Sequence, residues 1–360
     1  MRFATRAAPV LLLALACLGL SGDPARAGDP IPPLDGDVAY VSTRDGNFEI
    51  YVIERGTDIE HRLTNNSVAD TSPNWSPLGD KIAFIRAGDV FVMNADGSGA
   101  AQLTFTGANS DPSWSPLSDK IAFSRGLGAG NRDIFVMNAD GSAQTNITEH
   151  FAQDVNPDWS PEASQIVFQS DRTGDWEVYV MGATGLAPTN ISESPGFDGD
   201  PVWHPRLPRV AFTSDRTGDA EVFAMDADGT DVFQATDDPA FDAEPGWAPG
   251  GVGLVFRSDR DGNDEIYGLA PGGPFRITTS PADETQPDWQ PLPNAGIGDV
   301  NCDSLITAVD STLVLQFDAF LIDDIDCLVN GHTNDDPFIN SIDALVILQF
   351  VAGFIDHLPL

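Results

Sequence analysis

The stretch DTSPNWSPLGDKIAFIRAGDVFVMNADG, residues 70–97, decides the fold, because close copies of it follow one another along the chain. A tryptophan two residues before a proline marks each copy, and successive tryptophans are 39, 45, 44, 44 and 42 residues apart. The marked positions are Trp75, Trp114, Trp159, Trp203, Trp247 and Trp289. After each of the first five come a β-branched or aromatic run, a Gly/Asp turn, an alternating run and a short closing run. This order predicts four short antiparallel strands per copy.

Four such strands every 40 to 45 residues are typical of a β-propeller blade. The repeats begin at a second strand, DVAYVS (residues 37–42), and end on a lone tryptophan strand at PDWQP (residues 287–291). Pairing this last strand with the first three completes a sixth blade and closes the ring, which removes open sheet edges. We therefore predict an all-β, six-bladed β-propeller over residues 35–291, present as a monomer.

The motifs P-x-W-S-P, K-I-A-F and D-I-F-V-M-N-A-D-G resemble the TolB-type, or PD40, propeller repeat. The resemblance covers residues 35–291 and implies binding and scaffolding rather than catalysis. No mixed α/β domain stands before the propeller, so we expect a protein distinct from TolB itself. The absence of a G-x-S-x-G motif and of a following hydrolase domain argues against a propeller-gated peptidase.

Acidic residues recur at two positions of the repeat. Five residues before each tryptophan stand Asp70, Asn109, Asp154, Asp198, Asp242 and Glu284. The five acids of this set form either an acidic ring at the channel mouth, suited to a cation or a basic peptide, or side-chain caps of turns. The second set precedes each third strand and consists of Glu49, Asp89, Asp133, Glu177, Glu221 and Glu265. These acids form either a charged binding ring or local bonds to arginine or backbone that tie each hairpin.

A second domain is expected at residues 299–360, after a linker at 292–298. Oxygen ligands spaced for a calcium loop are Asp299, Asn301, Asp303, Leu305 through its carbonyl, Thr307 and Asp310. A second loop offers Asn334, Asp336, Phe338 through its carbonyl, Asn340 and Asp343, with His332 in place of the first aspartate. We expect calcium in the first loop, and the second loop is the weaker candidate for another ion.

An apolar helix is expected after each loop, and the pair resembles the type I dockerin module over residues 297–358. The resemblance implies a small α-helical domain that attaches to a cohesin in the presence of calcium. The positions that carry cohesin specificity in that family are here Ala308-Val309 and Ser341-Ile342, mostly apolar, so another envelope protein or the propeller itself is an equal alternative. Cys302 and Cys327 flank the first helix, and we expect them to form a disulfide.

The N-terminus reads as a signal peptide over residues 1–27, with Arg2 and Arg6, an apolar run at 10–20 and Ala25-Arg26-Ala27. We predict cleavage before Gly28, a short segment at 28–34, and a secreted, periplasmic or extracellular product. The residues before Cys17 are Ala14-Leu15-Ala16, which lack the leucine expected at the first lipobox position, and this disfavours a lipoprotein. No later stretch is suited to a membrane span.

The net charge of the chain excludes some classes of binding partner. The chain has 18 Lys+Arg against 55 Asp+Glu, a formal net charge of −37, and loss of three arginines and one aspartate with the leader makes it −39. Such a surface repels nucleic acid and anionic lipid, and the five histidines form no metal-ligand pair.

The sequence favours a secreted, non-catalytic binding or scaffold protein, whose propeller recognises a protein or glycan and whose tail attaches it. The alternative is a secreted carbohydrate-active enzyme or accessory subunit in polysaccharide catabolism, of the glycoside hydrolase or polysaccharide lyase type, since two carboxylates suffice for sugar cleavage.

Overall fold

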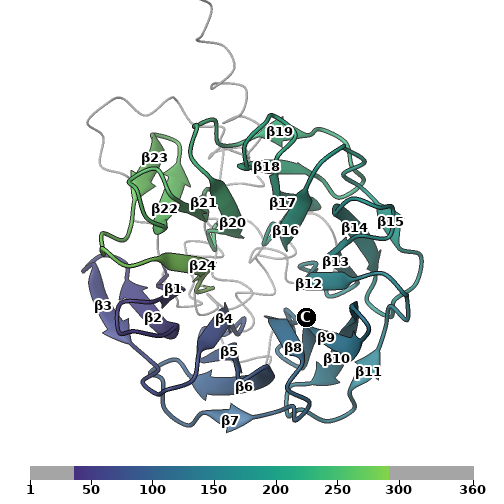
Figure 1. Cartoon of the computed structure of the whole chain (residues 1–360), viewed down its shortest axis with the longest axis horizontal. Coiled ribbons are helices and arrows are strands. Elements are labelled where there is room, and N and C mark those ends of the chain that lie inside the picture. The colour runs from purple at the N-terminus through teal and green to yellow at the C-terminus, as the bar shows by residue number, and fades with distance from the viewer. Residues whose placement is uncertain (1–35, 292–360) are drawn as a thin grey trace, which may run out of the picture. The chain divides into compact units, whose positions relative to one another are not determined.

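The structure, a computed structural model, describes residues 36–291. This region contains 24 strands and no helix, arranged as six four-stranded antiparallel sheets. The sheets stand around a common centre like the blades of a propeller (Figure 1). The predicted all-β, six-bladed propeller is confirmed. The expected signal peptide, linker and C-terminal domain lie outside the described residues.

Each blade runs outward from an innermost strand that borders the centre (Figure 1). Blade 1 contains β24 (Glu284–Trp289), β1 (Val38–Ser42), β2 (Glu49–Glu54) and β3 (Ile59–Arg62). Blade 2 contains β4 (Asp70–Trp75), β5 (Lys81–Arg86), β6 (Asp89–Asn94) and β7 (Ala101–Gln102). Blade 3 contains β8 (Asn109–Trp114), β9 (Lys120–Gly128), β10 (Asn131–Asn138) and β11 (Thr145–Asn146).

The other three blades repeat this order. Blade 4 contains β12 (Asp154–Trp159), β13 (Gln165–Ser170), β14 (Glu177–Gly182) and β15 (Thr189–Asn190). Blade 5 contains β16 (Asp198–Trp203), β17 (Arg209–Ser214), β18 (Glu221–Asp226) and β19 (Phe233–Gln234). Blade 6 contains β20 (Asp242–Trp247), β21 (Leu254–Ser258), β22 (Glu265–Ala270) and β23 (Gly273–Arg276).

Blade 1 closes the ring by pairing the two ends of the repeat region. Its sheet order is β24-β1-β2-β3, and Val38 and Ser42 of β1 pair with Trp289 and Glu284 of β24. The indole nitrogen of Trp289 also donates a hydrogen bond to the carbonyl oxygen of Gly36 over 2.9 Å. The closure predicted from the incomplete first and last repeats is therefore confirmed.

The core lies between neighbouring blades, because each sheet is buried on both faces. The second strand of every blade places one fully buried aromatic ring at the same position: Tyr40, Phe84, Phe123, Phe168, Phe212 and Phe256. The repeated tryptophan at the end of each innermost strand packs across the junction; Trp75, for example, joins Ile50 of blade 1 to Phe84 of blade 2. The apolar residues of the repeated motif thus serve chiefly to pack neighbouring blades against each other.

The outermost strands differ from expectation. In blades 2 to 5 they contain two residues each, where the sequence predicted runs of four such as AQLT at 101–104. In blade 2 the amide of Leu103 still bonds to the carbonyl oxygen of Val90 over 2.8 Å, but the chain then turns towards the next blade. The last two residues of this run therefore still bind the third strand of their own blade, since the hydroxyl of Thr104 also accepts the amide of Val90 over 2.9 Å.

Candidate functional site

The five acids of the expected channel-mouth ring, Asp70, Asp154, Asp198, Asp242 and Glu284, each open an innermost strand. All are almost completely buried, with exposures of 0–1%. Each carboxylate accepts a hydrogen bond from an arginine of its own blade: Arg86, Arg172, Arg216, Arg260 and Arg44 in the same order. Their charge is thus compensated inside the blades.

The arginines are held from a second side by aromatic rings. The guanidinium carbon of Arg216 lies 5.2 Å from the ring centre of Phe212 and 5.0 Å from that of Phe223. Its Nε also donates to the hydroxyl of Ser214 over 2.8 Å. The recurring Ser-Asp-Arg sequence therefore fixes a cation between two rings and a carboxylate, which favours one geometry for the whole corner.

The acids before the third strands bind the connection to the next blade. Glu221 is typical, since its carboxylate accepts the amide N–H of Asp238 over 2.9 Å and the hydroxyl of Thr236. In five of the six blades such an acid accepts a backbone N–H from that connection. The arginines of the turns pair instead with the first-strand acids. Most of this set therefore bonds to backbone, while Glu49 also pairs with Arg62 and Glu265 pairs with Arg276.

The centre of the ring holds a different group of side chains. The third residue of every innermost strand has a positive φ of 50–55° beside a register shift, and these residues are Ser72, Asp111, Asn156, Asp200, Glu244 and Gln286. Their bonds cross from one innermost strand to the next. The amide of Ser72 donates to Gln286 Oε1 over 2.8 Å, and the amide of Gln286 donates to Glu244 Oε2 over 2.7 Å.

Two more carboxylates occupy the fifth position of these strands. Asp158 of β12 accepts the hydroxyl of Ser113 and the amide of Trp203, both over 2.8 Å, and so bridges β8 and β16. Asp288 of β24 accepts the amide of Trp75 over 2.6 Å. The strands β12 and β24 stand opposite each other in the ring, and the two charges repel (Figure 1).

We name Asp111, Asp158, Asp200, Glu244 and Asp288 the central carboxylates. Burial raises the pKa of all five, to about 6 for Asp158 and about 7 for Asp200 and Asp288. Arg257 lies 3.1 Å from Glu244, and Arg132 acts on Asp111. Five acidic side chains thus lie near only two arginines, so the centre of the ring favours the binding of a positively charged group.

The central carboxylates make stability depend on pH, and Asp288→Asn tests this. The folded pKa near 7 exceeds the ordinary value of 3.8, so the contribution to stability is complete below pH 3.8 and is lost as the pH rises through 7. We expect the Tm of the wild type to fall from pH 5 to pH 8 more steeply than that of Asp288→Asn, in thermal unfolding followed by circular dichroism. Asp96→Asn, at an exposed turn, is the control and should not flatten the slope; equal slopes for Asp288→Asn and wild type would contradict the assignment.

The central carboxylates were not among the residues predicted from the repeats. They stand three residues and one residue before the tryptophans, where the repeats differ from one another: Ser72, Asp111, Asn156, Asp200, Glu244 and Gln286 in one series. The sequence signal that could have indicated them is the presence of acids in only some repeats, at positions that face the centre of the ring. Among residues 36–291, no three His, Cys, Asp or Glu side chains are placed to hold a metal ion.

His204, which replaces the serine of the W-S-P turn, is a structural residue. It is buried, and its ring lies 4.6 Å from that of Trp247 in an edge-on arrangement. Nδ1 accepts the amides of Arg206 and Leu207, and Nε2 lies 3.2 Å from the carbonyl oxygen of Gly251. Burial lowers the pKa of His204 to about 4, so the ring is neutral at physiological pH.

The remaining expectations fall outside the described residues. They concern the calcium ligands Asp299, Asn301, Asp303, Leu305, Thr307, Asp310, Asn334, Asp336, Phe338, Asn340 and Asp343, and the pair Cys302 and Cys327. Within the part of the chain that the structure describes, no helix has the length and apolar character needed to cross a membrane.

Comparison with known proteins agrees with the architecture. The family model of the TolB β-propeller domain (PD40) matches residues 30–128, 103–193 and 186–296. TolB from Acinetobacter baumannii superimposes with a TM-score of 0.65 at 18% identity, covering 72% of this chain and 68% of that one. A structure assigned as TolB from Agrobacterium tumefaciens gives 0.57 at 19% identity, covering 68% and 88%. Hydrazine synthase of Kuenenia stuttgartiensis also gives 0.57, at 14% identity and covering 72% and 46%. At these identities the likeness concerns the fold alone, and no curated protein matches the chain.

Proposed function

The chain belongs to the TolB β-propeller family, and from this membership we propose that it is an exported, non-catalytic binding protein whose propeller recognises a protein partner. Export rests on the leader-like residues 1–27. The propeller supplies a rigid frame, since its repeated polar residues are occupied within and between the blades. Recognition then falls to side chains that differ from blade to blade.

The observation that carries this proposal is the charge at the centre of the ring. The acids at the strand starts are neutralised by arginines, whereas the central carboxylates outnumber the two arginines beside them. A lysine or arginine side chain of a partner would supply the missing positive charge and would restore ionisation of Asp158 and Asp288. We therefore propose a partner with a basic segment.

The tail has a separate proposed role. The loop Asp299 to Asp310 has calcium-ligand spacing, and its resemblance to dockerin modules favours calcium-dependent attachment to a cohesin-like or envelope protein. The propeller would then select one protein while the tail anchors the chain to another.

A defined peptide tests the propeller. We would measure binding of hexalysine to the full mature chain by calorimetry, at 20 and 150 mM salt. Asp158→Asn/Asp288→Asn should weaken binding by roughly 30-fold at low salt, because two contacts of the order of 1 kcal/mol each are lost. The control Asp96→Asn/Asp228→Asn removes the same charge from exposed turns and should leave the affinity within about twofold.

The outcomes separate the two roles. Equal affinity in both double variants would reject the centre as the recognition site, and preference for a neutral oligosaccharide over hexalysine would favour a glycan instead. For the tail, we expect Asp310→Ala to abolish calcium binding at the first loop in the same calorimeter without changing the affinity for hexalysine. Calcium binding that persists unchanged in Asp310→Ala would contradict the loop assignment.

A further inference from the structure

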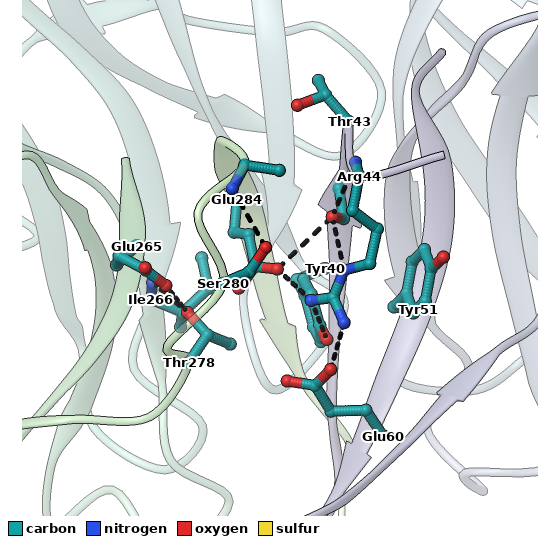
Figure 2. A network of polar contacts seen from close by, with 12 residues as sticks. Tyr40, Thr43, Arg44, Tyr51, Glu60, Glu265, Ile266, Thr278, Ser280 and Glu284 are labelled. Carbon is teal, nitrogen blue, oxygen red and sulfur yellow. Dashed lines mark hydrogen bonds and ion pairs between the residues drawn. The ribbon is translucent and has the colours of Figure 1, made fainter. Parts of the chain in front are cut away.

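Glu284 stands where the two ends of the ring meet. It begins β24, pairs with Ser42 of β1, and its side chain is fully buried (Figure 2). Its Oε1 accepts hydrogen bonds from the guanidinium of Arg44 and from the hydroxyl of Ser42, the latter over 3.3 Å. Its Oε2 is buried and has no hydrogen-bond partner among the described residues. A buried carboxylate oxygen without a donor is destabilising.

The groups beside Glu284 offer no hydrogen to this oxygen. The hydroxyl of Thr278 lies beside both Glu284 and Glu265, but it donates to Glu265 Oε2 over 2.7 Å and accepts the amide of Ile266 over 2.8 Å (Figure 2). A hydroxyl carries one hydrogen, and that hydrogen is already used. Two acids therefore face each other across the junction of blades 6 and 1 with one hydrogen too few.

Blade 3 shows how the same position is completed. Asn109, the counterpart of Glu284, accepts the Nε of Arg125 through Oδ1 over 2.8 Å, as Glu284 accepts Arg44. Its Nδ2 lies 3.0 Å from both Thr104 Oγ1 and Asp89 Oδ1, the counterparts of Thr278 and Glu265. The side-chain N–H of Asn109 thus points across the blade junction at the place where Glu284 has an oxygen without a hydrogen-bond donor. A protonated carboxyl group presents an O–H in the same direction.

Most of the other blade junctions do not need this hydrogen. In Asp70, Asp198 and Asp242 both carboxylate oxygens accept from the arginine of the blade. Asp154 resembles Glu284 in this respect, because its Oδ2 has no hydrogen-bond partner within residues 36–291. Glu284 is distinguished because it belongs to the strand that closes the ring.

We propose that Glu284 is protonated in the folded propeller and donates its proton from Oε2 to the Thr278–Glu265 pair, so that closure of the ring is strengthened by acid and weakened by alkali. Protonation removes one of two facing charges and supplies the missing donor at the same time. Loss of the proton leaves two buried carboxylates in repulsion at the junction of blade 6 with blade 1, the blade that joins the two ends of the repeat region.

The charges around Glu284 agree with this direction. Burial raises its pKa and Glu265 raises it further, while the hydroxyl of Thr278 and the charge of Arg44 lower it; the net shift is upward. Arg44 also pairs with Glu60 and contacts the hydroxyl of Tyr40, so its charge is shared (Figure 2). Across the junction, Arg276 pairs with Glu265. Since the folded pKa lies above 4.5, the stabilisation is complete below pH 4.5 and is lost as the pH rises through the folded value.

Glu284→Gln in the full chain tests the proposal, because glutamine presents a permanent N–H as Asn109 does. We would record the Tm of both proteins from pH 4.5 to 8.5. We expect equal values at pH 4.5 and a Tm for Glu284→Gln about 3 °C above the wild type at pH 8.5. The matched variant Asp198→Asn, at a position where arginine fills both oxygens, should instead lower the Tm at every pH.

A reciprocal variant keeps the test sharp. Asn109→Asp places a carboxylate opposite Asp89 and should lower the Tm increasingly as the pH rises. The proposal fails if Glu284→Gln lowers the Tm at pH 8.5 as Asp198→Asn does, or if its difference from wild type is the same at both ends of the pH range. A pH-independent effect of Asn109→Asp would overturn the comparison between the two blade junctions.

Discussion

Replacing Phe212 with alanine should remove about 3–5 kcal/mol of unfolding free energy. The ring is fully buried, its centre lies 6.0 Å from that of Phe223, and it packs in the cluster that joins blade 4 to blade 5. Truncation leaves a cavity between two sheets that cannot easily collapse, since each sheet is also held by its other neighbour. It also removes one of the two rings that flank Arg216.

Urea unfolding followed by tryptophan fluorescence measures this loss. The control is Phe105→Ala, because Phe105 is 78% exposed and its truncation should change the unfolding free energy by less than about 0.5 kcal/mol. A similar small loss for Phe212→Ala would show that the blades do not depend on packing at this junction.

Removing the arginine of a buried pair should have an effect of similar size. Arg216→Ala leaves Asp198 buried at 1% exposure with both carboxylate oxygens deprived of their donor, and we expect a loss of about 3 kcal/mol at pH 7.5. Arg216→Lys should restore little, because an ammonium group neither forms both bonds nor stacks between Phe212 and Phe223.

The same unfolding assay, run at pH 7.5, checks this. Arg209→Ala breaks a more exposed pair with Asp226 and should lose about 1 kcal/mol or less. If Arg216→Ala and Arg209→Ala lose equal amounts, the buried corner is not a significant source of stability.

The fold was predictable because its determinants are local and repeated. A tryptophan, a β-branched run and a Gly/Asp turn each specify a strand or its end, and regular spacing turned six weak signals into one strong one. The unpaired second strand at residues 37–42 and the lone strand at 287–291 were enough to predict how the ring closes. The lengths of the outer strands could not be predicted in this way, because they depend on where each connection leaves the sheet.

The candidate site was predictable only in part, for the opposite reason. Repetition reveals what every blade needs, and the repeated acids, such as Asp198 and Glu221, proved to be held by their own blade and by the connection that follows it. The central carboxylates are irregular by nature: Asp158 and Asp288 occupy a position where other repeats carry asparagine, serine, valine or glycine. Their importance depends on the inward direction of these positions, which a single sequence does not state.

The pairing of β1 with β24 also has a consequence for how the protein folds. Ser42 and Glu284 are separated by 242 residues, so their contact closes a very long loop and comes late. During synthesis, which begins at the N-terminus, the inner edge of β1 stays unpaired until β24, the last strand, has been made. During that interval the edge can pair with another chain, and aggregation competes with completion of the last blade. The yield of native protein should thus be limited by the time between the appearance of the first strand and that of the last.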